Sequence, residues 1–178
     1  TGATTSRYLG SFYATASNQT EDSFAKRNLW NFYNQVDRPM RVLETDDTWD
    51  YTLATWRQAG AVATNQIEAM VGVAGTMVDG YVKAGVSNTN AAVAVGIAIG
   101  EDSTSTPLTE SYSGVTIMAA TNIAALPVGI MKRYPAEGRH TWVWLERSAA
   151  TGTTSWWSAW TSGAVQYNQG GIWGCLKG

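Results

Sequence analysis

The longest apolar stretch of this 178-residue chain is Ala91-Ala92-Val93-Ala94-Val95-Gly96-Ile97-Ala98-Ile99-Gly100. Branched side chains alternate with alanine or glycine, which is the period of two that is typical of a β-strand. A strand with no polar residue on either face is normally covered on both faces. In a two-layer sandwich, the small-residue face must then be covered by a loop or by another subunit, and we favour the subunit. The predicted subunit-interface residues are Val93, Ala94, Val95, Gly96, Ile97, Ala98 and Ile99.

Period-two patterns also occur on both sides of this stretch. They cover Trp49–Leu53, Ile67–Val73, Val78–Val86 and Trp142–Arg147, and turn-forming clusters such as Ser87–Asn90 separate them. The composition agrees, because the chain has 9 Trp, 8 Tyr and 18 Gly and few strong helix formers apart from alanine. Short strands separated by turns, with almost no helical pattern between them, predict an all-β fold, an antiparallel β-sandwich of the jelly-roll type.

The segment Thr20–Val36 has a different pattern and predicts one short N-terminal helix. Thr20 or Ser23 can cap a helix, and acidic residues follow Thr20, where the helix dipole favours negative charge. Apolar side chains recur at helical spacing at Ala25, Leu29, Phe32, Tyr33 and Val36. We therefore expect residues 1–39 to form a strand and this helix, and residues 40–178 to form the sandwich, with both parts in one compact unit.

Composition and charge argue against several classes of function. A net charge of -2 and a pI near 5.3 argue against nucleic-acid binding. With Cys175 and His140 as its single cysteine and histidine, the chain cannot form a four-ligand Cys/His zinc site. The longest apolar stretch is too short for a membrane-spanning helix. We expect no cofactor, no bound metal, no nucleic-acid partner and no membrane insertion.

Acidic residues cluster at two places in the sequence. Asp46, Asp47 and Asp50 lie close together, but their spacing does not match a helix-loop-helix calcium loop, so we interpret them as an acidic turn. The pair Glu101-Asp102 follows the apolar strand, but neighbouring residues point apart and no opposing acid is apparent for glycoside hydrolysis. His140 has no serine elbow to serve as its partner. The sequence therefore predicts a protein that is not an enzyme and has no catalytic residues.

The densest aromatic region lies near the end of the chain. Aromatic side chains can stack on sugar rings or anchor protein interfaces, and they also fill cores. Trp156 and Trp157 are consecutive, so they point to opposite faces of a strand. The candidate carbohydrate or receptor contacts are Trp156, Trp157, Trp160 and Tyr167. The alternative is that all four belong to the core or to subunit contacts.

Several short motifs, in the order in which they occur, resemble a C-terminal domain of structural proteins of tailed bacteriophages and related prophages. Glu137–Glu146, followed by Gly152–Thr154, is similar to the closing motif of that family, and Gly96–Thr104 is similar to its G-[IV]-G-x-D-S-T segment. The other matching segments are Glu21–Asn34, Arg38–Tyr51 and Ala54–Ala59. The similarity extends from about Tyr8 to Gly178, and the sequence departs from the family pattern at Thr153–Trp160.

The resemblance implies a role rather than an activity. It implies a β-sandwich displayed on the surface of a virion, in a tail fibre, a head fibre or a capsid decoration. Such appendages are commonly homotrimers that contact other virion proteins and bind a host-surface glycan or protein. The expected function is therefore that of a non-enzymatic, oligomeric virion protein. The alternative is a lectin-like carbohydrate-binding module that uses surface Trp and Tyr side chains.

Overall fold

The computed structural model describes residues 6–118, 125–162 and 165–178, without the side chains at 160–162 and 165–167. Within these residues the chain forms strands and two single-turn 3₁₀ helices, η1 (Ala59–Ala61) and η2 (Thr109–Ser111). No helix in this part of the chain is both long and apolar enough to cross a membrane.

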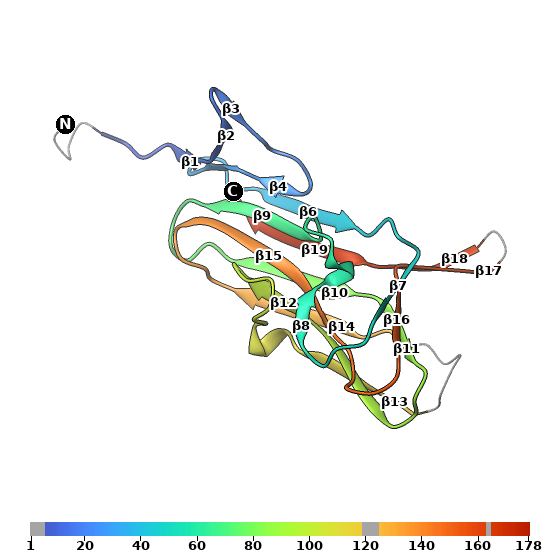
Figure 1. Cartoon of the computed structure of the whole chain (residues 1–178). Helices are drawn as coiled ribbons and strands as arrows, with labels where there is room; N and C mark the ends of the chain where they lie inside the picture. The colour runs from blue at the N-terminus through green and yellow to red at the C-terminus, as the bar shows by residue number, and fades with distance from the viewer. Residues whose placement is uncertain (1–5, 119–124, 163–164) are drawn as a thin grey trace.

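Two antiparallel sheets form the body of the molecule (Figure 1). The first sheet has the strand order β14-β10-β19-β6, and the second has the order β13-β12-β15-β9-β4, where the short strand β4 (Lys26–Arg27) pairs in parallel with β9. The first contains β6 (Asp37–Leu43), β10 (Val78–Lys83), β14 (Val128–Arg133) and β19 (Gly171–Lys177). The second contains β9 (Gln66–Val71), β12 (Val93–Glu101), β13 (Ser113–Ile117) and β15 (Gly138–Arg147).

The order of these strands confirms the predicted jelly-roll sandwich. When β6, β9, β10, β12, β13, β14, β15 and β19 are numbered 1 to 8 along the chain, the sheets read 1-8-3-6 and 2-7-4-5. Successive strands therefore alternate between the sheets for most of the chain, as in a jelly roll of two Greek keys. The first and last strands are neighbours, with a register that extends from Asp37 opposite Lys177 to Leu43 opposite Gly171.

Shorter strands extend the sandwich at its margins. At one end β16 lies between β11 and β7 in a three-stranded sheet, β17 pairs with β18, and β8 pairs with the end of β15. Figure 1 shows the β17–β18 pair extending away from the body. The bounds are β7 (Thr48–Tyr51), β8 (Trp56–Gln58), β11 (Gly85–Asn88), β16 (Thr154–Trp157), β17 (Ala159–Ser162) and β18 (Val165–Gln169).

The predicted helix over Thr20–Val36 is wrong, because this segment forms short strands. Ser23 hydroxyl accepts a hydrogen bond from the Lys26 N–H, as an N-cap would, but the Ser23 N–H donates to the Lys26 carbonyl and closes a tight turn. The Glu21 carboxylate then pairs with the Lys26 ammonium at 2.9 Å. The strands of this N-terminal arm, residues 6–36, are β1 (Gly10–Phe12), β2 (Ala14–Ala16), β3 (Gln19–Thr20), β4 (Lys26–Arg27) and β5 (Leu29–Asn31).

Trp30 attaches the N-terminal arm to the sandwich. Its ring lies directly over Gly72, where a Cβ atom would overlap the ring atoms. Its indole N–H donates to the Lys177 carbonyl at 2.9 Å, and the side chain is 2% exposed. The arm is therefore fixed by tertiary contacts, which also include the parallel pairing of β4 with β9, rather than by helical hydrogen bonds.

The core lies between the two sheets, and β12 contributes to it as predicted. Val95, Ile97 and Ile99 belong to one apolar cluster with the buried tryptophans Trp142 and Trp144 of the neighbouring strand β15. The alternation that identified this strand thus places its branched side chains inside.

The predicted subunit interface on β12 is wrong for Val95, Gly96, Ile97, Ala98 and Ile99, which are buried within one chain. On the small-residue face, Ala98 packs with Val143 and Leu145 beneath Trp56. A Cβ atom on Gly96 would lie 3.4 Å from the Trp56 ring. The chain itself therefore covers this face, which was the alternative to a second subunit. At the start of the strand, Val93 is half-buried and Ala94 is exposed.

Candidate interaction surface

The outer face of the first sheet carries an unusual row of apolar side chains. Alternation along β10 buries Val78 and Val82 and turns Tyr81 outward. In register, Tyr81 lies opposite Ile130 on β14 and opposite Trp173 on β19. The Tyr81 and Trp173 rings stack with an angle of 8° and a centroid distance of 4.9 Å. Three neighbouring strands thus place apolar groups side by side on one surface.

This surface is open to solvent in the single chain. Ile130 is 62% exposed, and Tyr81 is 41% exposed. We call it the aromatic face, and it consists of Leu43, Tyr81, Val128, Ile130 and Trp173. The outward face of an antiparallel sheet in a sandwich is ordinarily polar. A contiguous exposed apolar patch is typical of a protein–protein contact.

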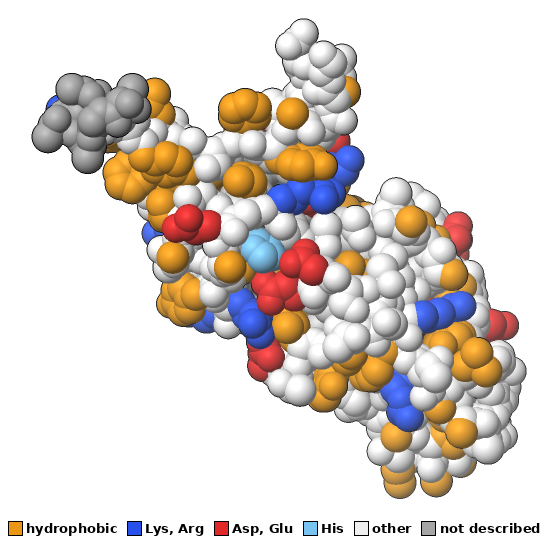
Figure 2. All heavy atoms as spheres, turned by 60° about the vertical axis from the view of Figure 1, so that its left-hand side comes forward, with side chains coloured by type: hydrophobic (Ala, Val, Ile, Leu, Met, Phe, Trp, Pro, Cys, Tyr) orange, Lys and Arg blue, Asp and Glu red, His pale blue; other side chains and the backbone are white. Residues whose placement is uncertain are grey.

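The N-terminal arm forms a second apolar surface. Half of the large hydrophobic side chains that are exposed in the described residues lie between Tyr8 and Val36. Figure 2 shows hydrophobic side chains gathered along this part of the molecule. The arm also borders a cavity of about 620 Å³, which is lined by β1, β5, Val36 and Gly178. The exposed members are Tyr8, Leu9, Phe12, Tyr13, Phe24, Leu29, Phe32, Tyr33 and Val36.

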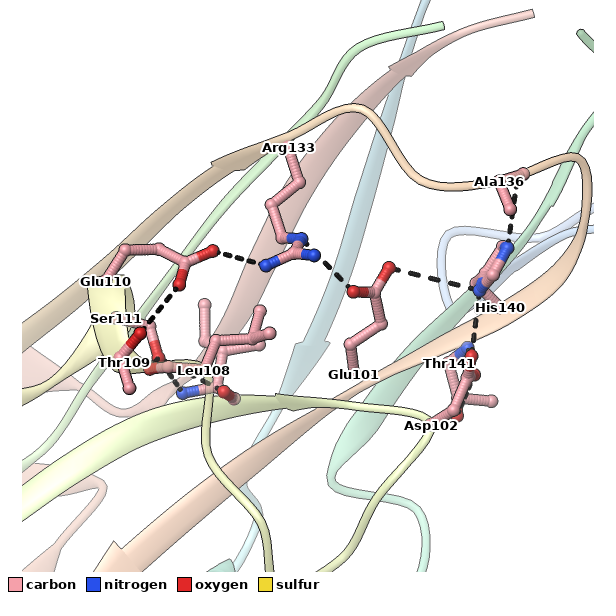
Figure 3. A network of polar contacts seen from close by, with 11 residues as sticks. Glu101, Asp102, Leu108, Thr109, Glu110, Ser111, Arg133, Ala136, His140 and Thr141 are labelled. Carbon is pink, nitrogen blue, oxygen red and sulfur yellow. Dashed lines mark hydrogen bonds and ion pairs between the residues drawn. The ribbon is translucent and has the colours of Figure 1, made fainter. Parts of the chain in front are cut away.

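A polar network joins the ends of β12, β14 and β15 (Figure 3). His140 Nδ1 lies 2.8 Å from Asp102 Oδ2, and His140 Nε2 lies 3.0 Å from the Ala136 carbonyl oxygen. A carbonyl and an ionised carboxylate both accept hydrogen bonds, so each ring nitrogen of His140 lies beside an acceptor. Figure 2 shows this histidine at the surface beside acidic side chains.

Asp102 is the centre of this network. It also accepts hydrogen bonds from the Thr141 N–H at 2.7 Å and from the Thr141 hydroxyl. Burial acts to raise the pKa of Asp102, but the bonds from Thr141 and His140 outweigh it and hold the pKa below its usual value. Its backbone has a φ of 52°, which aspartate tolerates better than most residues. The network therefore fixes a loop to β15.

Glu101 and Arg133 extend the network to η2. Glu101 Oε1 lies 3.9 Å from His140 Nδ1, and Glu101 Oε2 lies 3.1 Å from Arg133 Nε. Arg133 Nη1 in turn lies 2.7 Å from Glu110 Oε1. Each carboxylate faces a cationic partner, which is the arrangement of an ion-pair network that joins strand ends.

The predicted carbohydrate contacts fall in different environments. Trp156 is 0% exposed and belongs to the core, so its predicted role as a surface contact is wrong. Trp157 is half-buried and lies beside Gly85 on the neighbouring strand. The side chains of Trp160 and Tyr167 lie outside the described residues.

Other acidic residues of the sequence have ordinary protein partners. Asp50 accepts a hydrogen bond from the Ser155 hydroxyl at 2.7 Å. In the part of the chain that the structure describes, no group of three or more His, Cys, Asp or Glu side chains is placed to hold a metal ion. The sequence did not reveal the aromatic face, because its members are far apart in the chain. A local signal was the period-two pattern of β10, which places Asp79, Tyr81 and Lys83 on the outward side of the strand.

Comparison with known proteins gives similarities of fold alone. No protein-family model matches the sequence, and no curated protein matches it. The structure of Eiger TNF from S. frugiperda is similar over 81% of this chain and 92% of that chain, with 10% identity and a TM-score of 0.46. A sugar-binding protein, the EclA C-terminal domain, is similar over 65% of this chain and 77% of that chain, with 13% identity and a TM-score of 0.33. Neither similarity is high enough to support an inference about function.

Proposed function

We propose that this chain is a non-enzymatic structural domain displayed on the surface of a phage particle, where it assembles as a homotrimer. The observation that carries the proposal is the aromatic face, an exposed apolar sheet surface around Tyr81, Ile130 and Trp173. The resemblance of the sequence to phage structural proteins supports the location. In the trimer, the aromatic face is buried between subunits.

The aromatic face suits a protein contact better than a sugar contact. The exposed side chains beside the stacked Tyr81 and Trp173 rings include Val128 and Ile130, which are aliphatic and cannot hydrogen-bond to the hydroxyl groups of a sugar. The Lys83 ammonium lies 5.5 Å from the centre of the Trp173 ring. Lys83 lies between Val128 and Gly171 in the sheet, so this cation is within the aromatic face. Exposed aromatic side chains are enriched in protein–protein interfaces.

A closed trimer needs two different surfaces on each subunit. In a cyclic trimer, each contact joins one patch of a subunit to another patch of the next subunit. The chain offers two such patches, the aromatic face and the N-terminal arm. Three copies then act together, so a weak contact with the host surface or with another virion protein becomes avid through effective concentration.

The oligomeric state is tested by a charge placed in the aromatic face. Ile130→Lys introduces an ammonium where the side chain is 62% exposed, and Leu53→Lys is the matched control, at 60% exposed on a loop. Light scattering after size exclusion should give three times 19.2 kDa for the wild type and the control, and 19.2 kDa for Ile130→Lys. A monomeric wild type, or a trimer that persists in Ile130→Lys, would contradict the assembly.

The location on a particle is tested separately. Antibodies raised against the purified domain should decorate the surface of intact particles in electron microscopy. Label confined to disrupted particles, or absent from them, would reject surface display whatever the oligomeric state.

A further inference from the structure

A small pocket lies on the outer face of the second sheet, away from the aromatic face. The register places Trp56 opposite Arg147, Arg147 opposite Gly96, and Gly96 opposite Gly114. Two adjacent glycines, Gly96 and Gly114, leave the sheet surface without side chains at the β13 end of this row. With Ala94 beside them, they form the floor of a pocket of about 210 Å³.

Aromatic rings form one wall of the pocket. Trp56 and Tyr112 are parallel within 7°, with ring centroids 5.7 Å apart, and the edge of Trp56 reaches over Gly96. Tyr112 is 53% exposed, so its ring is accessible to a ligand and is not part of the core. The negative face of such a ring attracts the polarised C–H groups of a sugar ring.

Arg147 gives the pocket a positive charge. Its Nε donates to the Ala54 carbonyl at 3.2 Å, which fixes the guanidinium and leaves its two terminal nitrogens for other partners. Among the ion pairs of the described residues, each of Arg57, Arg133 and Arg139 has a carboxylate, and Arg147 has none. A guanidinium with two parallel donors is suited to bidentate binding of a carboxylate.

We propose that this pocket binds one sugar residue that carries a carboxylate, as in the uronic or sialic acids of surface polysaccharides. The sugar ring stacks on the aromatic wall above the glycine floor, and its carboxylate pairs with Arg147. A volume of about 210 Å³ suits a single ring rather than a larger ligand. The site does not require the trimer for binding, and it rests on the proposed function only for its role in host attachment.

The test uses the full chain and ligand-observed NMR titration. The probes are the methyl glycosides of glucuronic, galacturonic and N-acetylneuraminic acid, with methyl glucoside as the neutral control and inorganic phosphate as the simple anion. At least one acidic glycoside should bind about tenfold or more tightly than methyl glucoside, because the glucoside lacks the group that pairs with Arg147. Equal binding of the neutral glucoside, no binding of any acidic glycoside, or competition by phosphate at the same affinity would overturn the proposal.

The site itself is located by filling its floor. A Cβ atom on Gly114 would meet only the Val95 carbonyl oxygen, at 3.6 Å, so Gly114→Val fits this edge strand and occupies the pocket. Its control is Thr116→Val on the same face of β13. Gly114→Val and Arg147→Lys should each lower the affinity about tenfold or more, and Thr116→Val should not. Unchanged affinity in a folded Gly114→Val variant would place the ligand elsewhere, and light scattering on the same samples reports the trimer independently.

Discussion

Among single residues, Asp102 has an uncommon backbone conformation and is also the centre of the polar network. Its carboxylate holds Thr141 and His140, and its left-handed backbone turns the chain out of β12. Asparagine tolerates the same backbone region, so replacement of Asp102 by asparagine changes the charge and leaves the turn geometry in place.

Asp102→Asn should lower the free energy of unfolding at neutral pH by about 0.5–1 kcal/mol, a value reduced for the exposure of this group. The pKa of Asp102 lies below its usual value, so its carboxylate stabilises the fold above the unfolded pKa. That contribution is lost as the pH falls through the folded pKa, and the difference between variant and wild type should therefore shrink in acid. Urea unfolding at about pH 7 and about pH 2 measures both values. A difference that stays constant across this range would contradict the assignment.

Residue types alone did not reveal which polar side chains are buried. Glu146 appeared as one end of an alternating strand, but it is 0% exposed and accepts hydrogen bonds from Trp49 at 2.6 Å and Arg57 at 2.7 Å. Burial raises its pKa, and these bonds oppose the shift. The partners lie far away in the chain, and only the pairing of β15 with β8 brings Arg57 to Glu146.

Among the elements, the strands were predictable and the N-terminal arm was not. In β9, β12 and β15 one side of the strand faces the core, so large apolar side chains recur at every second position. These strands can therefore be recognised from the sequence. In the arm, Leu29, Phe32 and Val36 have helical spacing but are exposed. The conformation of the arm depends on the contact of Trp30 with Gly72 and on the pairing of β4 with β9, both of them distant contacts that no local pattern encodes.

Gly72→Ala should loosen the part of the N-terminal arm that contains β1 and β5, and should leave the sandwich folded with β4 paired to β9. The added methyl group overlaps the Trp30 ring, which then loses its site and its hydrogen bond to Lys177. Hydrogen exchange should become faster in β1 and β5, and should stay slow in β12 and β15. Gly114→Ala, whose methyl group meets no part of the arm, is the control. Unchanged protection of the arm would mean that Trp30 does not attach it.

At the scale of the whole molecule, the jelly roll gives each sheet a distinct outer surface. The first sheet presents the aromatic face, and the second presents the Arg147 pocket. The sequence indicated the aromatic C-terminal region as a contact, but Trp156 is buried and the outward ring on β19 is Trp173. Which ring faces outward depends on strand pairing with Tyr81, a residue of a distant segment.

Cys175 provides a natural probe of assembly, because it lies on β19 between Asp79 and Pro39, on the same outer surface as Trp173. Burial raises the pKa of the Cys175 thiol, and the Asp79 and Asp37 carboxylates add to the effect. The thiolate is the reactive form, so labelling by a disulfide reagent at neutral pH should be slow.

Labelling of Cys175 should be faster in Ile130→Lys than in the wild type, because the proposed subunit contact no longer covers the first sheet. Leu53→Lys, which leaves that sheet unchanged, should label at the wild-type rate. The rates are followed by absorbance of the released thiol under native conditions. Equal rates in all three proteins would show that Cys175 is equally accessible with and without the charge, against burial of this surface in an assembly.

The pairing of the first and last sandwich strands has a mechanical consequence. Asp37 begins β6 and lies opposite Lys177 at the end of β19, so the two ends of this strand pair emerge side by side. A force that pulls these ends apart loads one hydrogen bond at a time, from Asp37 toward Leu43, and opens the pair like a zipper. A force along the strands would instead load all the bonds of the pair together. Tension that pulls Asp37 and Lys177 apart therefore acts in the direction in which this strand pair resists least. The rate of forced unfolding will depend on how the domain is tethered.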